Sequence, residues 1–414
     1  MEMGLRVFSV CVRLQVAVWL ACLAYAASAQ GRFYSLGFLP GDTGSAANAV
    51  SDNAIVVGYG DQWAFFWHPE TGMRALMFPN ARATIAYAVS ADGIVAGQAM
   101  IGIYGYACYW DETGAYLIHN RPSMAKGVSY DGRILAGWGE NRMGTFARVQ
   151  PFVFNRVENQ FVFLPEPVGS AGTCFVYCLS GDGRVLGGMS MMPHPRFRRG
   201  LSARGFVWID GVPTERVLPS GGFGSQVNAL SYNGRIAVGS AEIHPDFGSS
   251  SQAVLWEDAN ATLLGTLGGA SSVALGTDRE GRQVVGSSRL ADGTGRAFYW
   301  TRAVGMVSLQ DLFAAYIPAG WTLTSANGIS PNGRYITGVG TNPQGATEAW
   351  LLDTGRNCYS AGDMDGNGCV DNADLLSVLF AFGGSGSPED TNCDGVVDDA
   401  DLLEVLFNFG NGCG

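Results

Sequence analysis

The sequence predicts an all-β fold, a seven-bladed β-propeller, followed by a small α-helical module with two calcium loops. Three observations predict the propeller: a turn motif that recurs seven times, an aromatic strand motif after each turn, and a strand that is missing from the last copy and present before the first. We expect a signal peptide at 1–29, the propeller at 30–356 and the paired calcium-loop module at 357–414.

The turn motif reads Ser-x-Asp/Asn-Gly-Arg, followed by apolar residues and a closing glycine. Asp-Gly and Asn-Gly supply the positive φ of a tight hairpin turn, and the β-branched residues that follow favour a strand. The closing glycine indicates close backbone approach or a bulge. The turn positions 54, 93, 132, 183, 234, 281 and 333 lie 39 to 52 residues apart, as expected for one repeated unit with variable loops.

The second motif is a small residue followed by aromatic and apolar residues, as in Ala64–Trp67, Gly205–Trp208 and Ala297–Trp300. We expect its final Trp or Phe to pack between blades rather than to form a ligand platform. A third strand follows in most copies. The seventh copy, Ala349–Leu352, lacks one, and Arg32–Leu39 supplies its counterpart. A solenoid would need capping repeats instead, so we expect a ring closed by its two ends.

Three stretches, Leu264–Gly269, Arg282–Gly286 and Arg296–Trp300, resemble the HAF family of bacterial extracellular repeats. The resemblance covers residues 32–353 and is clearest in copies five and six, whereas copies two to four lack the Leu-Gly-Thr-Leu-Gly-Gly element. It implies a secreted, propeller-like domain of no established activity.

The N-terminus has the pattern of a secretory signal peptide. Arg6 and Arg13 give a positively charged start, and Val16–Ala26 is an apolar run. Ala27–Ala29 then forms a small-residue cleavage site. This run is too short to span a membrane, and no later segment reaches about 18 apolar residues. We therefore expect a secreted protein, extracellular or in the bacterial envelope, without a transmembrane segment. A buried N-terminal strand or helix is the less favoured interpretation.

The net charge of −11 comes from the tail, because residues 358–414 contain 11 carboxylates and no Lys or Arg. The remaining chain has 25 acidic and 25 basic residues, so the sequence offers no basic face for nucleic acid. Lys126 is the one lysine among the 25 basic residues. We attribute this to the base composition of the gene and assign Lys126 no role.

Two acidic segments of the tail, 363–374 and 390–401, lie 27 residues apart and share the spacing of calcium loops. Oxygen side chains at positions 1, 3 and 5 can converge on one cation, the glycine at position 6 allows a sharp turn, and position 7 offers its carbonyl. Position 12 is Asp374 or Asp401 in place of the usual Glu. The alternative is a pair of acidic N-capped helices without metal.

The loop–helix duplicate has no helix before either loop and resembles a type I dockerin over residues 358–412. The resemblance implies two Ca²⁺ ions and attachment to a cohesin-like or envelope protein through residues 357–414. It places the first ligand set on Asp363, Asp365, Asn367, Cys369 and Asp374, and the second on Asp390, Asn392, Asp394, Val396 and Asp401. Asp371 and Asp398 would act through water.

Four cysteines depart from the usual dockerin pattern, since Cys369 and Cys393 fall inside the loops and Cys358 and Cys413 bracket the unit. The resemblance brings the termini together and favours Cys358 with Cys413 and Cys369 with Cys393, although four cysteines allow three pairings. Seven cysteines remain after the signal, and this odd count predicts at least one free thiol. Cys174 and Cys178 are awkwardly spaced in a strand for a local disulfide.

No catalytic motif surrounds the four histidines, His68, His119, His194 and His244. His194 and His244 precede prolines in long loops, which either line a ligand mouth or are ordinary surface loops. The basic cluster at 196–199 with Arg204 either binds an anionic sugar or carboxylate or is a solvated loop tip.

We therefore predict a non-catalytic binding and assembly protein whose propeller face recognises a ligand, a glycan being one possibility. The alternative is a dockerin-tethered hydrolase or lyase acting on polysaccharides, whose acid–base pair the sequence does not identify. A structural envelope component with the propeller as a spacer is a third interpretation.

Overall fold

The computed structural model describes residues 31–143, 146–194, 200–219, 222–243, 251–356, 362–364, 369–384, 389–392 and 396–411. The predicted signal peptide lies outside these residues. One compact unit spans Phe33–Leu352, and a second contains the chain from Asp353 onward. None of the helices in the described part combines the length and hydrophobicity that a membrane-spanning helix needs.

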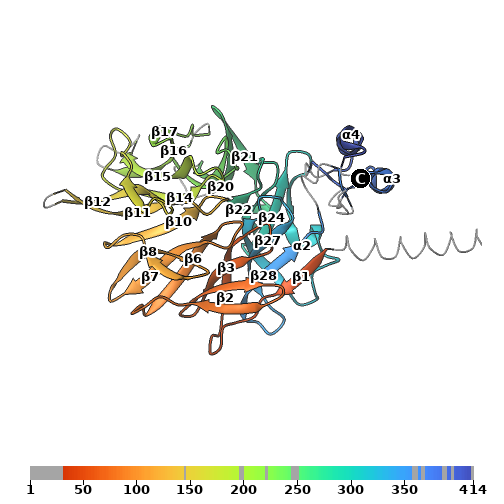
Figure 1. Cartoon of the computed structure of the whole chain (residues 1–414). Coiled ribbons are helices and arrows are strands. Elements are labelled where there is room, and N and C mark those ends of the chain that lie inside the picture. Colours follow the sequence, from red (N-terminus) through yellow and green to blue (C-terminus); the bar gives the residue numbers. More distant parts are fainter. Residues whose placement is uncertain are drawn as a thin grey trace, which may run out of the picture. The chain divides into compact units, whose positions relative to one another are not determined.

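The first unit consists of seven four-stranded antiparallel sheets, which confirms the predicted all-β, seven-bladed propeller (Figure 1). Blades one to three are β2 (Ser45–Val50), β3 (Val56–Gly60), β4 (Ala64–His68), β5 (Gly72–Leu76); β6 (Ala83–Val89), β7 (Val95–Ile101), β8 (Tyr104–Asp111), β9 (Gly114–Leu117); and β10 (Ser123–Val128), β11 (Ile134–Met143), β12 (Phe146–Asn155), β13 (Gln160–Phe163).

Blades four to seven follow the same strand order, except that the last one takes its outer strand from the start of the chain. They are β14 (Cys174–Leu179), β15 (Val185–Pro193), β16 (Leu201–Ile209), β17 (Val212–Glu215); β18 (Gly224–Leu230), β19 (Ile236–Glu242), β20 (Ser251–Glu257), β21 (Asn260–Gly265); β22 (Gly268–Thr277), β23 (Val284–Leu290), β24 (Gly295–Thr301), β25 (Gly305–Ser308); and β26 (Thr322–Ile329), β27 (Tyr335–Thr341), β28 (Thr347–Asp353), β1 (Arg32–Ser35). A one-turn helix, α2 (Leu309–Leu312), links blades six and seven.

The ring closes through β1, as the permuted repeat predicted, because β1 is hydrogen-bonded to β28 at the edge of blade seven. Its side chains join the two sides of the closure. Phe33 packs against Trp321 and Trp350 of blade seven, whereas Tyr34 packs edge-on against Trp67 of blade one. Aromatic burial on both sides of one short strand therefore stabilises the closed ring.

The first strands of the seven blades surround the central axis, since each contacts the first strands of both neighbouring blades. Because the ring is closed, β26 of the last blade also contacts β2 of the first. Asparagine side chains reinforce it at three interfaces: the Nδ2 atoms of Asn48, Asn228 and Asn327 donate hydrogen bonds of 2.7 to 2.9 Å to carbonyls of the next first strand.

The repeated turn has the predicted positive φ in all seven copies. Glycine occupies the position in six of them, with φ between 68° and 84°, and Ala54 takes φ 57° in the first. The serine that opens the turn has a role of its own, because its hydroxyl accepts a hydrogen bond from the amide that begins the second strand, as from Ile134 to Ser129 at 3.0 Å. The turn thus satisfies an amide that the hairpin leaves unpaired.

The closing glycine of each repeat lies opposite a β-bulge in the first strand of its blade. In blade three, Gly137 pairs with Ala125, and the register shifts between Ala125 and Gly127. A Cβ at Gly137 would overlap the carbonyl oxygen of Met124, so only glycine permits this approach. Bulges at the same place occur in all seven blades.

A serine or threonine hydroxyl links successive blades at five of the seven interfaces. It accepts a hydrogen bond of 2.8 to 3.0 Å from the amide of the small residue that opens the aromatic motif of the preceding blade. The last of these, from Ala349 to Ser45, joins blade seven to blade one. Sequence analysis did not find this link, because its two partners lie on different repeats.

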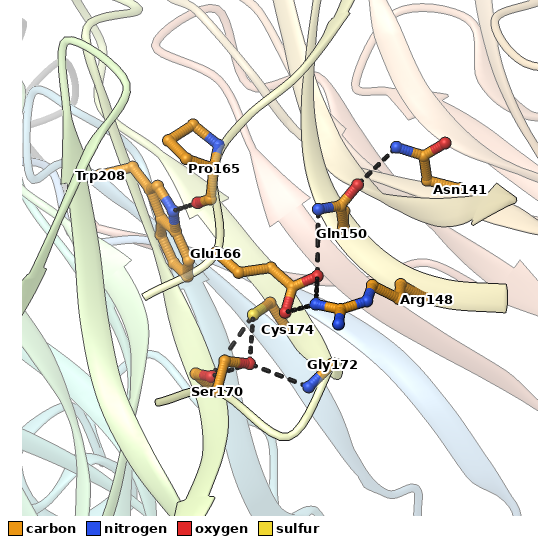
Figure 2. Close-up of polar contacts among 10 residues, drawn as sticks. Asn141, Arg148, Gln150, Pro165, Glu166, Ser170, Gly172, Cys174 and Trp208 are labelled. Carbon is orange, nitrogen blue, oxygen red and sulfur yellow. Dashed lines mark hydrogen bonds and ion pairs between the residues drawn. The ribbon is translucent and has the colours of Figure 1, made fainter. Parts of the chain in front are cut away.

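One of the two exceptions lies between blades three and four, where Pro151 has no amide hydrogen to donate and Cys174 replaces the serine. Near this interface Glu166, in the segment that leads from blade three to blade four, binds β12 of blade three: its carboxylate accepts two hydrogen bonds of 3.1 Å from Arg148 and one of 3.0 Å from Gln150 (Figure 2). A charge-assisted contact, in which one Arg148 nitrogen donates to both carboxylate oxygens, therefore holds the segment between the two blades against blade three.

The aromatic motif is buried between blades, as predicted. Its closing residues are at most 7% exposed, and they are Trp67, Trp110, Phe154, Trp208, Trp256, Trp300 and Leu352. Three indole N–H groups donate to carbonyls of the preceding interblade segment. Cys108, Cys174 and Cys178 are buried free thiols, so the predicted free thiol is confirmed and no local disulfide joins the last two.

The second unit contains two equivalent helices, α3 (Asn372–Ala381) and α4 (Asp399–Asn408). Its small core consists of four valines, Val370, Val378, Val397 and Val405. The backbone of Val370 is hydrogen-bonded to the end of α4, and that of Val397 to the end of α3. Each loop is therefore tied to the helix of the other half.

We predict that Gly137→Ala lowers the free energy of unfolding by about 2–3 kcal/mol, because backbone atoms surround the site and leave the new methyl no space. Thermal and urea denaturation would measure the change. Gly295→Ala is the matched control, since a Cβ there meets nothing closer than 3.7 Å. Equal stability of the two variants would contradict the close-approach argument.

Candidate functional site

The central channel presents one side chain from each blade in a single ring. Each of these residues occupies the bulge of its first strand and precedes the opening residue of the repeated turn by three positions. The ring surrounds a cavity of about 340 Å³ and consists of Asn48, Tyr87, Lys126, Tyr177, Asn228, Leu275 and Asn327. The fold thus gathers seven residues that are spread over 280 positions of the sequence.

The ring has two chemically distinct sides. Tyr87, Lys126 and Tyr177 come from the adjacent blades two, three and four and form an aromatic and cationic side. Three asparagines from blades five, seven and one form an amide side. Leu275 of blade six interrupts the amides. A ligand in the channel would therefore meet a positive charge on one side and neutral hydrogen-bonding groups on the other.

Lys126 carries the only charge of this ring. Its ammonium nitrogen lies 3.5 Å from the centroid of the Tyr87 ring, within range of a cation–π interaction. In the described part of the chain no carboxylate pairs with it. Burial lowers the pKa of Lys126 to about 8, because desolvation disfavours the ammonium form. The amine is therefore mostly protonated at neutral pH but without a fixed counter-charge.

The two tyrosines of the ring remain neutral at physiological pH. Burial is the main cause that raises the pKa of Tyr87 to about 12, and burial also raises the pKa of Tyr177. Their hydroxyl groups are therefore available as neutral donors and acceptors, and no phenolate competes for Lys126.

The turn end of the channel is narrowed by side chains of the turns themselves. Tyr130 of blade three donates a 2.9 Å hydrogen bond to Asp52 of blade one, and its ring packs edge-on against Tyr232 of blade five. The guanidinium of Arg279 lies 4.7 Å from the Tyr232 ring centroid. Backbone hydrogen bonds link these turns to one another around the ring. A structural belt therefore occupies this end.

The residues that the sequence singled out on the propeller do not form a shared site in the described part of the chain. His194 packs against Phe223 at 5.6 Å between ring centroids, and Arg204 pairs with Glu215 at 2.6 Å. His244 and the arginines at 196–199 lie outside the described residues. The sequence did not predict the channel ring. Lys126, to which the sequence analysis assigned no role, is the charged residue of this ring.

In the tail, the position-12 aspartates fold back over their own loops. The Oδ1 atom of Asp374 accepts a 2.6 Å hydrogen bond from the amide of Met364, and Oδ2 accepts one of 2.8 Å from the amide of Asp371. Asp401 repeats this arrangement with Thr391, Asn392 and Asp398. Both carboxylates are fully buried. Each belongs to the capping box at the start of its helix, as the N3 residue.

The first position of the second loop is also buried. Asp390 and Arg356 are both about fully buried and lie 3.8 Å apart. The carboxylates of Asp374 and Asp401 lie against their own loops, and carboxylate oxygens are the ligands that a hard cation such as Ca²⁺ prefers. No three His, Cys, Asp or Glu side chains converge as a metal site within the described residues. Three predicted ligands, Asp365, Asn367 and Asp394, fall outside them.

The disulfide pairing stays a prediction. Cys369 is disulfide-bonded, and Cys358, Cys393 and Cys413 lie outside the described residues.

Among the other predicted calcium ligands, Asp363, Asn392, Val396 and Asp398 are described, and Asp371 and Asp398 are the N-caps of α3 and α4.

The two tail helices expose equivalent apolar side chains. Phe380 is 86% exposed and Phe407 is 82% exposed, and they occupy the same position in the duplicate. The other members of the exposed set are Leu376, Leu379 and Phe382 on the first half and Leu403, Leu406 and Phe409 on the second. A water-exposed phenylalanine repeated on both halves is a candidate for an interaction surface.

Comparison with known proteins assigns the chain to no family. No protein-family model matches the chain, and neither does a curated protein sequence. Solved structures with distant similarity include TolB from Acinetobacter baumannii (14% identity, TM-score 0.39, covering 63% of this chain and 62% of that chain). An oligogalacturonate lyase from Vibrio parahaemolyticus has 10% identity and a TM-score of 0.49 over 78% of this chain and 97% of its own.

The β-propeller domain of the trilobed protease from Pyrococcus furiosus also has 10% identity and a TM-score of 0.49, over 75% of this chain and 96% of its own. At such identities and scores the activities of these proteins are not transferred. The class assignment, a seven-bladed β-propeller, follows from the strand order.

We predict that the Lys126 amine titrates near pH 8 in the folded protein and near 10.4 in the unfolded chain. Acylation rates of the Lys126 peptide, followed by mass spectrometry from pH 6 to 11 with and without urea, would measure both midpoints. Because the folded pKa is the lower one, this lysine destabilises the fold fully below pH 8, and the effect disappears as the pH rises past the unfolded value. A native midpoint at 10 or above would contradict the assignment.

Proposed function

We propose that this protein is an exported, non-catalytic binding and assembly protein. In this proposal the propeller binds a small polar ligand in its central channel, and the tail attaches the protein to a partner. The observation that carries the proposal is the channel ring, in which seven blades converge on a polar cavity with one ammonium group that has no carboxylate partner among the described residues. Ligand sites are typically concave and use a few convergent polar groups.

The ring composition favours binding over the alternative of polysaccharide hydrolysis. Glycoside hydrolysis requires a pair of carboxyl groups on either side of the scissile bond. The residues around the channel cavity are asparagine, tyrosine, lysine and leucine. Two carboxylates lie at the turn end: Asp52 is bound by Tyr130 and by the amide of Asn332, and Asp278 accepts hydrogen bonds from the amides of Arg282 and Gln283. This set can hold a ligand but provides no acid–base pair.

The tail supports a calcium-dependent attachment. Asp374 and Asp401 would hold Ca²⁺ with the other loop oxygens, and a bound cation would offset the repulsion among their carboxylates. Since each of these aspartates also belongs to the capping box of a helix, ordering of a loop would order the start of its helix. The exposed phenylalanines would then be presented to a protein partner, either cohesin-like or part of the envelope. The signal-like N-terminus supports export.

We predict that retention of the full chain on proteins of the host's secreted and envelope fractions requires calcium. A chelator, or Asp363→Ala combined with Asp390→Ala, should abolish retention because the loops lose a ligand each. Phe380→Ser with Phe407→Ser should weaken it by about tenfold or more, as expected for central apolar anchors. Pull-down with quantification of the captured partner would measure these effects.

Val168→Ser serves as the control, because Val168 is also an almost fully exposed apolar residue but belongs to the propeller. Calcium-independent retention, or unchanged retention of the double phenylalanine variant, would contradict the proposed tail function. Release of new reducing ends from a polysaccharide by the purified protein would contradict the non-catalytic role.

A further inference from the structure

We propose that the central channel binds a sugar acid, with its carboxylate on Lys126 and its hydroxyl groups on the asparagines of the opposite side. The proposal rests on the proposed ligand-binding function of the channel and names the chemical class of the ligand. It follows from the charge of the ring, from the arrangement of its two sides and from the volume of the cavity.

The charge of the ring selects a ligand with one negative charge. Lys126 is its single cation, and the described residues around the cavity include no carboxylate. A desolvated ammonium group is costly unless an anion pairs with it. One carboxylate compensates it fully, whereas a dianionic phosphate would leave one negative charge buried without a partner. The site also lacks an arginine fork, the side chain best matched to phosphate.

The aromatic side positions the carboxylate. Lys126 lies between blades that contribute Tyr87 and Tyr177, and its ammonium rests on the Tyr87 ring. This contact holds the flexible lysine stem against the wall of the channel, and it leaves the ammonium hydrogens that do not face the ring for the ligand. The tyrosine hydroxyls are neutral at neutral pH and add hydrogen-bonding groups beside the carboxylate.

The amide side matches hydroxyl groups. Asn48, Asn228 and Asn327 each donate one amide hydrogen to a neighbouring first strand, at 2.7, 2.9 and 2.8 Å. These bonds fix the orientation of the amides before a ligand arrives, which reduces the entropy lost on binding. A primary amide has a second N–H and an oxygen, and such neutral donor and acceptor pairs suit alcohols better than a second charge.

The cavity of about 340 Å³ is at the lower end of the range for small-molecule sites. It accommodates one monosaccharide or the end of a longer chain. A ligand with a carboxylate on one side and several hydroxyls on the other, at this size, is a uronic or aldonic acid.

Calorimetric titration of the full chain with glucuronate, glucose and inorganic phosphate tests the proposal. At pH 6.5 we expect saturable binding of glucuronate and at least tenfold weaker binding of glucose. At pH 9.5, only about 3% of an amine with a pKa of about 8 is protonated, so the affinity for glucuronate should fall about 30-fold. Tyr87 and Tyr177, the titratable groups that line the ring with Lys126, stay largely neutral over this range.

Variants locate the site. Lys126→Met should lose glucuronate binding, and Arg133→Met is the control, because Arg133 is an exposed cation of the same blade outside the ring. Should Lys126→Met fail to fold, the wild type still gives an answer. Glucuronate should slow the acylation of Lys126, the only lysine of the chain, and glucose at the same concentration should not.

Three results would overturn the proposal: equal binding of glucose and glucuronate, tighter binding of phosphate, or acylation of Lys126 at the same rate with glucuronate present. If glucuronate does not bind while the protein is still retained on a glycan without turnover, the sugar-acid proposal fails and the proposed binding function stands. If neither binding nor retention occurs, both fail.

Discussion

The close approach between the closing glycine of each repeat and the bulged first strand of the same blade determines the rest of this structure. Gly137 and its six equivalents leave room for a carbonyl that any Cβ would displace. The bulge that forms there turns one side chain per blade toward the axis. A contact that first serves strand pairing therefore also decides which residues line the channel, so the fold and the candidate site share one cause.

The sequence predicted what depends on neighbouring residues. The Asp-Gly turns, the buried aromatic motif and the outer strand at Arg32–Ser35 all followed from local patterns and from their repetition. The channel ring did not, because its members differ in type and meet only when the ring closes. The hydroxyl links between blades, such as Ala349 to Ser45, escaped for the same reason. The available signals were the fixed offset of three residues before each turn and the solitary lysine at that offset.

In the proposed function, one aspartate in each half of the tail serves two purposes. Each oxygen of Asp374 accepts a backbone hydrogen bond, one from the loop and one from the residue that caps α3. A cation at this aspartate would draw on the same oxygens, so loop closure and helix initiation are coupled through a single carboxylate. The spacing of the loops predicted this residue as a ligand. Its second role required knowledge of where α3 begins.

The choice of lysine in the channel favours the proposed binding over a role in filling the core. Arginine serves as the cation elsewhere in the chain and forms surface ion pairs with carboxylates, as Arg184 does with Asp210. Lys126 has an aromatic ring as its neighbour and no carboxylate partner in the described part of the chain. A position required only for packing would be satisfied by an apolar side chain, which avoids the desolvation penalty. In this proposal, a compact and strongly hydrated charge occurs at the axis because an anion from solution pairs with it.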